Sequence, residues 1–123
     1  MQANPVGWFE IYVQDMARAR RFYEAVLAGS LTRLDSPELE LWAFPMEEGK
    51  MGAPGALVKM EGKGPGGNGT LVYFSCEDCA TEVARIAGAG GRVERDKFSI
   101  GPYGFIALAS DTEGNLFGLH SMK

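Results

Sequence analysis

Very few side chains of this sequence carry a group suited to acid–base chemistry inside an apolar segment. Glu10 is one of them, because it lies in the aromatic and β-branched run from Trp8 to Val13. A carboxylate buried there has to be paired, protonated or functional, since its bare burial is costly. Two interpretations of Glu10 follow. It is a general base or a hydrogen-bond donor to a ligand, or it is a structural carboxylate bonded to a tyrosine or a backbone amide.

His120 is the only histidine of the chain. A histidine changes its charge near neutral pH, so one hypothesis is a proton relay between His120 and Glu10. The alternative is a structural histidine whose ring nitrogens are satisfied by neighbouring groups.

The only cysteines, Cys76 and Cys79, form a C-x-x-C motif. This spacing is found in redox pairs and in halves of zinc sites. The residues between them are Glu77 and Asp78, whose negative charges would raise a thiol pKa, and no second cysteine pair completes a zinc site. The motif therefore favours two structural cysteines, one at a strand end and one at a helix start.

The segments that position these groups form one pattern that occurs twice. The first copy begins with a strand over 8–13, and Asp15 is predicted to cap a helix over 16–27. Gly29 is predicted to end that helix in a left-handed conformation. Apolar residues at helical spacing predict one face of the helix: Ala19, Phe22, Tyr23 and Val26.

The second copy repeats this order about 63 positions later, with a strand over 71–76 and Asp78 as the next helix cap. Each helix is followed by three short apolar runs, which predict strands near 31–34, 39–44 and 56–60, and then from 93 onward, 105–109 and 115–121. The sequence thus predicts an α+β fold of two β-α-β-β-β modules, about 5–61 and 70–123, within a single domain over 1–123.

The glycine-rich segment 62–69 is predicted to be a flexible linker between the modules. It contains G-x-G-x-x-G at Gly62, Gly64 and Gly67, but a dinucleotide fingerprint has to follow a strand and open a helix. This segment holds a proline and leads into a strand, so we reject a nucleotide site.

The composition limits the possible partners. The net charge is −4, and the densest basic group is Arg18, Arg20 and Arg21, of which Arg18 and Arg21 are interpreted as the solvent-exposed face of a helix. The sequence contains no basic stripe of the kind that binds nucleic acid. It also shows neither an apolar run long enough to span a membrane nor a secretory signal. We expect a cytoplasmic protein.

The segment Phe9 to Asp15 with the Phe22-Tyr23 pair, and the segment Phe105 to Leu108 with the turn Asp111 to Asn115, resemble the vicinal-oxygen-chelate superfamily, the glyoxalase/bleomycin-resistance/dioxygenase proteins. The resemblance covers nearly the whole chain. It implies a curved mixed sheet around a cleft, and a homodimer.

Metal-using members of that family hold a divalent ion with His or Glu side chains from both modules. Carried over by the resemblance, these positions fall on Trp8, Leu71, Gly118 and the segment 56–58, none of which offers a ligating side chain. The resemblance with these replacements predicts no metal and no other cofactor, and it places the family's metal-dependent activities in question.

Residues two or four positions from the lost ligands are expected to face the same cleft, because side chains on a strand alternate between faces. With Trp8 itself, they are Glu10, Tyr12, Tyr73, Ser75 and His120. Further aromatic residues are predicted either to continue the wall or to pack in the core: Trp42, Phe44, Tyr103 and Phe105. Tyr103, between Pro102 and Gly104, is either a lid residue or an ordinary turn tip.

Two functions remain from the sequence. The first is a metal-free protein that binds a small molecule in an aromatic cleft, similar to the bleomycin-binding branch. The second is a glyoxalase-related lyase or isomerase that uses Glu10 and His120 as catalytic residues, or an atypical metal site. A domain whose aromatic surface serves self-association is a third.

Overall fold

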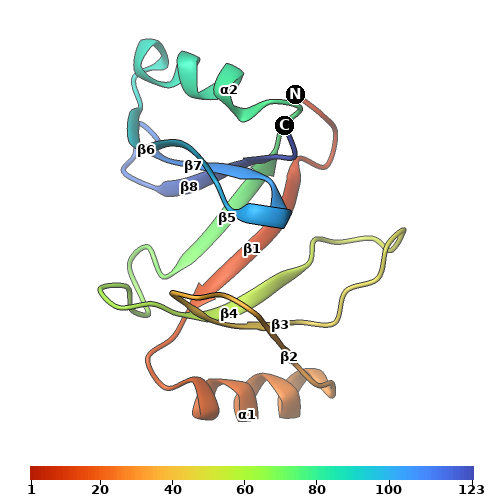
Figure 1. Ribbon diagram of the computed structural model, residues 1–123. Helices are drawn as coiled ribbons and strands as arrows, with labels where there is room; N and C mark the ends of the chain where they lie inside the picture. The colour runs from red at the N-terminus through yellow and green to blue at the C-terminus, as the bar shows by residue number, and fades with distance from the viewer. The chain divides into compact units, whose positions relative to one another are not determined.

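The computed structural model describes residues 1–123. Two three-residue 3₁₀ turns, η1 (Ala87–Ala89) and η2 (Gly101–Tyr103), accompany ten helices and strands. In chain order these are β1 (Val6–Tyr12), α1 (Met16–Leu27), β2 (Thr32–Leu34), β3 (Glu40–Ala43), β4 (Gly55–Lys59), β5 (Thr70–Ser75), α2 (Cys79–Ile86), β6 (Arg92–Ser99), β7 (Phe105–Ser110) and β8 (Leu116–Ser121). The predicted β-α-β-β-β order is therefore confirmed in both halves (Figure 1).

The hydrogen-bonded strand order is β2-β3-β4-β1-β5-β8-β7-β6, which makes an eight-stranded mixed sheet and confirms the α+β class. The chain divides into two units. We call Phe9–Thr70 the β1–β4 unit, and Met1–Trp8 together with Leu71–Lys123 the β5–β8 unit. The first residues of β1 thus belong with the second half of the chain. Neither helix is long and apolar enough to cross a membrane.

Helix α1 begins and ends where the sequence predicts, at Met16 and Leu27. Asp15 caps it, with a side-chain oxygen that accepts a hydrogen bond from Arg18 N at 3.0 Å. The prediction for Gly29 is wrong, because Ala28 takes the left-handed conformation, with φ 54°. The helix stops at Leu27, so the turn that satisfies its last carbonyls starts at Ala28, although glycine adopts this conformation at lower cost.

The predicted apolar face of α1 is partly wrong. Met16, Ala19 and Tyr23 pack on the sheet, at spacings of three and four residues, whereas Phe22 and Val26 are 59% and 62% exposed. The stripe that faces the sheet therefore starts at Met16, the first helical residue, and the other two apolar side chains point outward.

In the β1–β4 unit, α1 covers one face of the strands (Figure 1). Leu57 is fully buried under the helix, and its register partners Ile11 and Trp42 lie beside it on the same face. Because side chains alternate along a strand, Glu10 and Tyr12 point to the opposite face. We call the face opposite the helix the far face of each unit.

In the β5–β8 unit, α2 packs on a cluster centred on Cys79, Ala107 and Leu119 (Figure 1). Strand β5 runs parallel to β8, and β8 is antiparallel to β7, which is antiparallel to β6. As in the first unit, alternation sends every second side chain of these strands to the far face.

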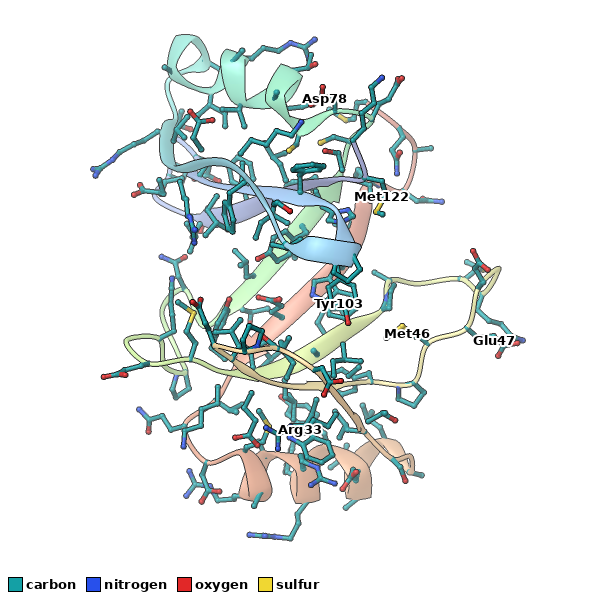
Figure 2. All side chains as sticks on the ribbon, viewed as in Figure 1. Arg33, Met46, Glu47, Asp78, Tyr103 and Met122 are labelled. Carbon is teal, nitrogen blue, oxygen red and sulfur yellow. The ribbon has the colours of Figure 1, made fainter.

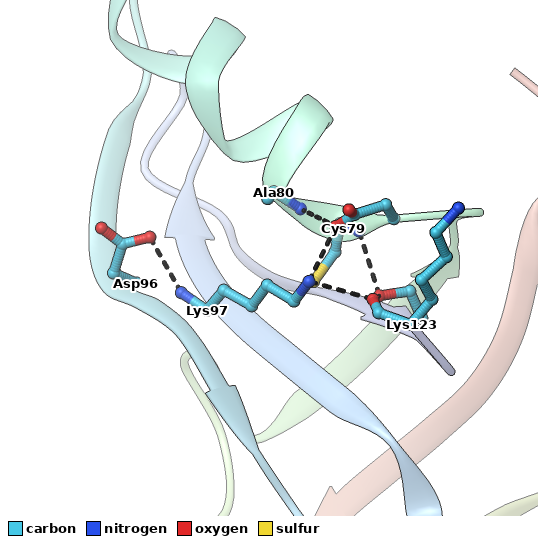
Figure 3. Close-up of polar contacts among 7 residues, drawn as sticks. Cys79, Ala80, Asp96, Lys97 and Lys123 are labelled. Carbon is cyan, nitrogen blue, oxygen red and sulfur yellow. Dashed lines mark hydrogen bonds and ion pairs between the residues drawn. The ribbon is translucent and has the colours of Figure 1, made fainter.

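The start of α2 is held by a polar cluster (Figure 3). Asp78 caps the helix by accepting from Ala80 N at 3.0 Å, as the sequence predicts. Lys97 Nζ donates to Asp78 Oδ1 at 2.8 Å and to the carbonyl of Lys123 at 2.9 Å. Buried Ser121 accepts from Cys79 N at 3.0 Å, so the first turn of α2 is also tied to β8.

The contact with Lys97, followed by that with Ala80 N, lowers the pKa of Asp78 below its ordinary 3.8. A carboxyl whose pKa is lower in the folded state stabilises the fold above its unfolded pKa, and this contribution is lost as the pH falls through the folded value. Asp78→Asn, which keeps a capping side chain, is thus expected to have a lower urea midpoint than the unaltered protein at pH 7. The difference between the urea midpoints of the two proteins should shrink below pH 3.8. A gap that stays constant with pH would contradict the role given to Lys97.

Candidate functional site

The far face of the β1–β4 unit carries a carboxylate and a phenol in direct contact. Tyr12 donates its hydroxyl to Glu10 Oε1 at 2.7 Å, and Tyr12 itself is only 5% exposed. Their strand neighbours on this face, Ala56 and Val58, are small and fully buried. The bond orients the Glu10 carboxylate, and it is also the tyrosine contact that the structural interpretation of Glu10 requires.

A groove of about 560 Å³ lies at the turn that follows β4. Lys63 on this turn holds its ammonium 5.9 Å from the centroid of the Tyr12 ring. The groove is lined by Val13, Gln14 and residues 59–64. From the sequence, residues 62–64 are expected in the linker and 59–60 at the end of a strand, so none of them is predicted to line a site.

Trp42 and Phe44 pack on the helix face of this unit, opposite Glu10 and Tyr12. The Arg20 guanidinium stacks 3.5 Å from the centroid of the Trp42 ring. Phe44 contacts the ring of Tyr23 on α1, with ring centroids 5.7 Å apart. Both aromatic residues therefore take the core-packing alternative, since Trp42 on β3 and Phe44 just after it lie two positions apart and face α1.

The far face of the β5–β8 unit brings three predicted residues together. Ser75 and His120 are register partners on the adjacent strands β5 and β8, and Tyr73 is paired with Gly118 two positions earlier. The Tyr73 ring lies directly over Gly118, where a side-chain carbon would collide with it. Gly7 likewise leaves room for the Ser75 hydroxyl.

His120 is fixed by the main chain of the loop before β7. Its Nε2 lies 2.6 Å from the carbonyl oxygen of Tyr103. A carbonyl only accepts, so Nε2 carries the proton and donates, and Nδ1 is the acceptor nitrogen of the neutral ring. The Tyr103 side chain projects from η2 and is 51% exposed (Figure 2). The loop thus both orients the histidine and presents an aromatic ring to solvent.

Phe105 and Trp8 are the two remaining residues that the sequence places in the cleft. Phe105 packs on the helix face, against the cluster of Cys79, Ala107 and Leu119, with Lys97 Nζ 4.8 Å from its ring centroid. Trp8 is half-buried on the part of β1 that belongs to the β5–β8 unit. Only Trp8 of this pair remains a candidate for ligand contact.

The C-x-x-C cysteines are free thiols. Burial, and then the carboxylate of Glu82, raises the pKa of Cys76 to about 11. The sequence predicts a raised pKa, but through Glu77 and Asp78. The acting carboxylate is instead one helical turn further along, on the face of α2 that packs on the sheet. A thiol with this pKa is almost entirely protonated at neutral pH, which favours the structural interpretation.

The positions at which the resemblance places metal ligands do not fit a divalent ion. Leu71 is 2% exposed and aliphatic, and the segment 56–58 is fully buried and aliphatic. Gly118 cannot carry a longer side chain, because the ring of Tyr73 occupies that space. These side chains provide none of the oxygen, nitrogen or sulfur ligands that such an ion needs.

Comparison with solved structures shows the same fold in enzymes of low sequence identity. Streptomyces coelicolor methylmalonyl-CoA epimerase, in a complex with 2-nitronate-propionyl-CoA, matches with a TM-score of 0.66 and 19% identity over 95% of this chain and 93% of that chain. The Mycobacterium tuberculosis methylmalonyl-CoA epimerase matches with a TM-score of 0.67 and 16% identity, over 100% and 93% of the chains. An uncharacterized Methanosarcina mazei protein matches at 0.63 and 14% identity, over 100% and 95%.

Curated proteins gave no match. The model of the Glyoxalase/Bleomycin resistance protein/Dioxygenase superfamily matches residues 6–119, nearly the whole chain. Together with the doubled β-α-β-β-β order and the eight-stranded sheet, this match means that the chain belongs to that superfamily.

Proposed function

We propose that the chain binds a small organic molecule on the far face of its β5–β8 unit. The observation that carries this proposal is the bond between His120 Nε2 and the carbonyl of Tyr103. It holds a histidine in one tautomer beside Ser75, on a face that also carries the aliphatic side chains of Ile106 and Leu108. A few oriented polar groups on an apolar surface are typical of small-molecule sites.

This proposal predicts ligand-dependent changes at named methyl groups. A set of planar cationic drugs, thiol conjugates and small carboxylic acids would be titrated against protein labelled at the methyl groups of isoleucine and leucine. At least one compound should shift the Ile106 and Leu108 signals in a saturable way. His120→Ala should weaken that compound by about tenfold, because a hydrogen bond in a partly buried site is lost.

Leu27, 62% exposed on α1, is the internal control, and its signals should not move. Ile86, which packs on the other face of the β5–β8 unit, is a second control. Shifts at these residues alone, or no saturable shift with any of the compounds, would contradict the proposal.

A second function, acid–base catalysis of an isomerase type, is favoured by the bond between Tyr12 and Glu10. A carboxylate oriented by a phenol is suited to remove the proton next to a carbonyl group, and inversion would need a second acid to deliver a proton to the other face. Methylmalonyl-CoA epimerases share the fold, so methylmalonyl-CoA is the appropriate probe.

If this second function holds, the unaltered protein exchanges the α-proton of methylmalonyl-CoA with solvent deuterium, measured by NMR. Glu10→Gln should slow this exchange at least about 100-fold, as expected for loss of a general base. Tyr12→Phe keeps the carboxylate and should slow it less. If Glu10→Gln lowers the melting temperature and leaves the exchange rate unchanged, Glu10 is structural.

The resemblance also implies a homodimer, and we include it in the proposal together with the cytoplasmic location that the sequence leads us to expect. Light scattering behind a sizing column measures the mass in solution, and a mass equal to one chain of 13.3 kDa would contradict the dimer.

A further inference from the structure

We propose that Arg95 selects ligands that carry a carboxylate group on the far face of the β5–β8 unit. This inference rests on the proposed binding function and names its ligand class. Simple alternation along β6 would place Arg95 on the same face as Val93, so the sequence alone does not predict this role. The paired residue of Val93 is Ala109, which points toward α2.

The register of β6 changes twice, and this change places Arg95 on the far face. Val93 pairs with Ala109, but Arg95 pairs with Leu108, so one extra residue lies between them on β6. A second shift follows, after which Phe98 pairs with Ile106. Such bulges re-aim side chains and are typical of edge strands near functional sites.

The registers place these residues in two rows that cross the strands from β6 to β5. One row runs through Phe98, Ile106, His120 and Ser75. The second row runs through Arg95, Leu108, Gly118 and Tyr73. The far face therefore has a cation at one side, an aliphatic middle, and an imidazole with a hydroxyl at the other side.

Arg95 is held in position without a carboxylate partner of its own. Its guanidinium carbon lies 3.4 Å from the centroid of the Phe98 ring. The other cations of β6 are already engaged, since Arg92 pairs with Glu94 at 3.4 Å and Lys97 with Asp78 at 2.8 Å. A guanidinium stacked on an aromatic ring keeps its N–H groups available for a planar carboxylate, which it binds through two parallel hydrogen bonds.

The strand spacing sets the length of the ligand. Strands β6 and β8 are separated by β7, so the side chains of Arg95 and His120 start from strands about 10 Å apart. A ligand that reaches both needs an apolar body of several carbons, which would lie over Ile106 and Leu108. The chemical class is thus an organic acid with an apolar body, rather than a planar cation.

The test compares 4-phenylbutyrate with its neutral amide, 4-phenylbutyramide, by titration of the Ile106 and Leu108 methyl signals. We expect the acid to bind the unaltered protein about tenfold more tightly than the amide, as one charge-assisted bond would provide. Arg95→Gln should remove that preference and leave the affinity for the amide unchanged. Arg95→Lys should keep only part of it, because an ammonium lacks the planar fork.

Arg92→Gln is the matched control, since it removes a cation from the same strand. Arg92 is already paired with Glu94 and is therefore not expected to bind the ligand. It should leave the preference for the acid intact. If the acid and the amide bind equally, or if Arg95→Gln retains the preference, the role of Arg95 is overturned while the binding function stands. If neither compound moves these methyl signals and no compound of the wider set does so, both proposals fail.

Discussion

Replacing Gly118 with alanine is expected to lower the free energy of unfolding by about 3 kcal/mol, at the upper end of the usual cost of overpacking. Gly118 is buried in β8 and is the register partner of Tyr73 on β5. The added methyl group would occupy the space of the Tyr73 ring, which is 6% exposed and has little room to move. Urea denaturation followed by circular dichroism measures the change.

Gly88→Ala is the matched control, because it adds the same methyl group where no atom lies within 4 Å. It should change stability by less than about 1 kcal/mol, and in the stabilising direction. In a Tyr73→Ala background, Gly118→Ala should cost far less than in the unaltered protein, because the collision is gone. An equal cost in both backgrounds would show that the ring of Tyr73 is not the cause.

The same contact occurs in both halves of the chain. Gly55 on β4 pairs with Phe9 on the parallel strand β1, and a side-chain carbon at Gly55 would collide with the Phe9 ring. The internal repeat found by sliding the sequence aligns Gly55 with Gly118, but it does not align Phe9 with Tyr73. The feature that repeats is thus a glycine packed under an aromatic ring of the paired strand. Aligning the two halves at a fixed offset matches the glycines but not the aromatic residues.

The secondary structure could be predicted because it depends on local patterns. Aspartates before apolar periodic segments mark the starts of both helices, and each predicted strand is found within two residues of its expected position. The left-handed cap at Ala28 could not be predicted in this way. Its left-handed conformation follows from the end of the helix at Leu27, one position too early for the glycine to take that place.

The site was only partly predictable. Alternation from Glu10 and Tyr73 correctly grouped residues within each strand, as the contact of Tyr12 with Glu10 shows. Alternation does not tell which face Trp42 or Phe105 takes. Each lies on a different strand from Glu10 and Tyr73, and its face depends on the register between strands. Arg95 could not be placed, since the register shift between Val93 and Arg95 reverses the face that alternation assigns to it.

The core under α1 should be the most sensitive part of the β1–β4 unit. Leu57→Ala is expected to lower the free energy of unfolding by about 3–4 kcal/mol, the range for a fully buried leucine. Leu57 is 0% exposed and packs with Met16 and Leu31, so the surrounding side chains have little freedom to fill the cavity. The fluorescence of Trp42, beside Leu57 on β3, reports the transition once Trp8 has been changed to Phe.

Leu27→Ala removes the same atoms from the end of α1, where the side chain is 62% exposed, and should cost less than about 1 kcal/mol. The contrast tests the assignment of the buried stripe on α1 as well as the burial of Leu57. If the two variants unfold at the same urea concentration, α1 does not cover β4 as described. The face of the strands assigned to Glu10 and Tyr12 would then have to be reassigned too, because it is defined as the face opposite Leu57.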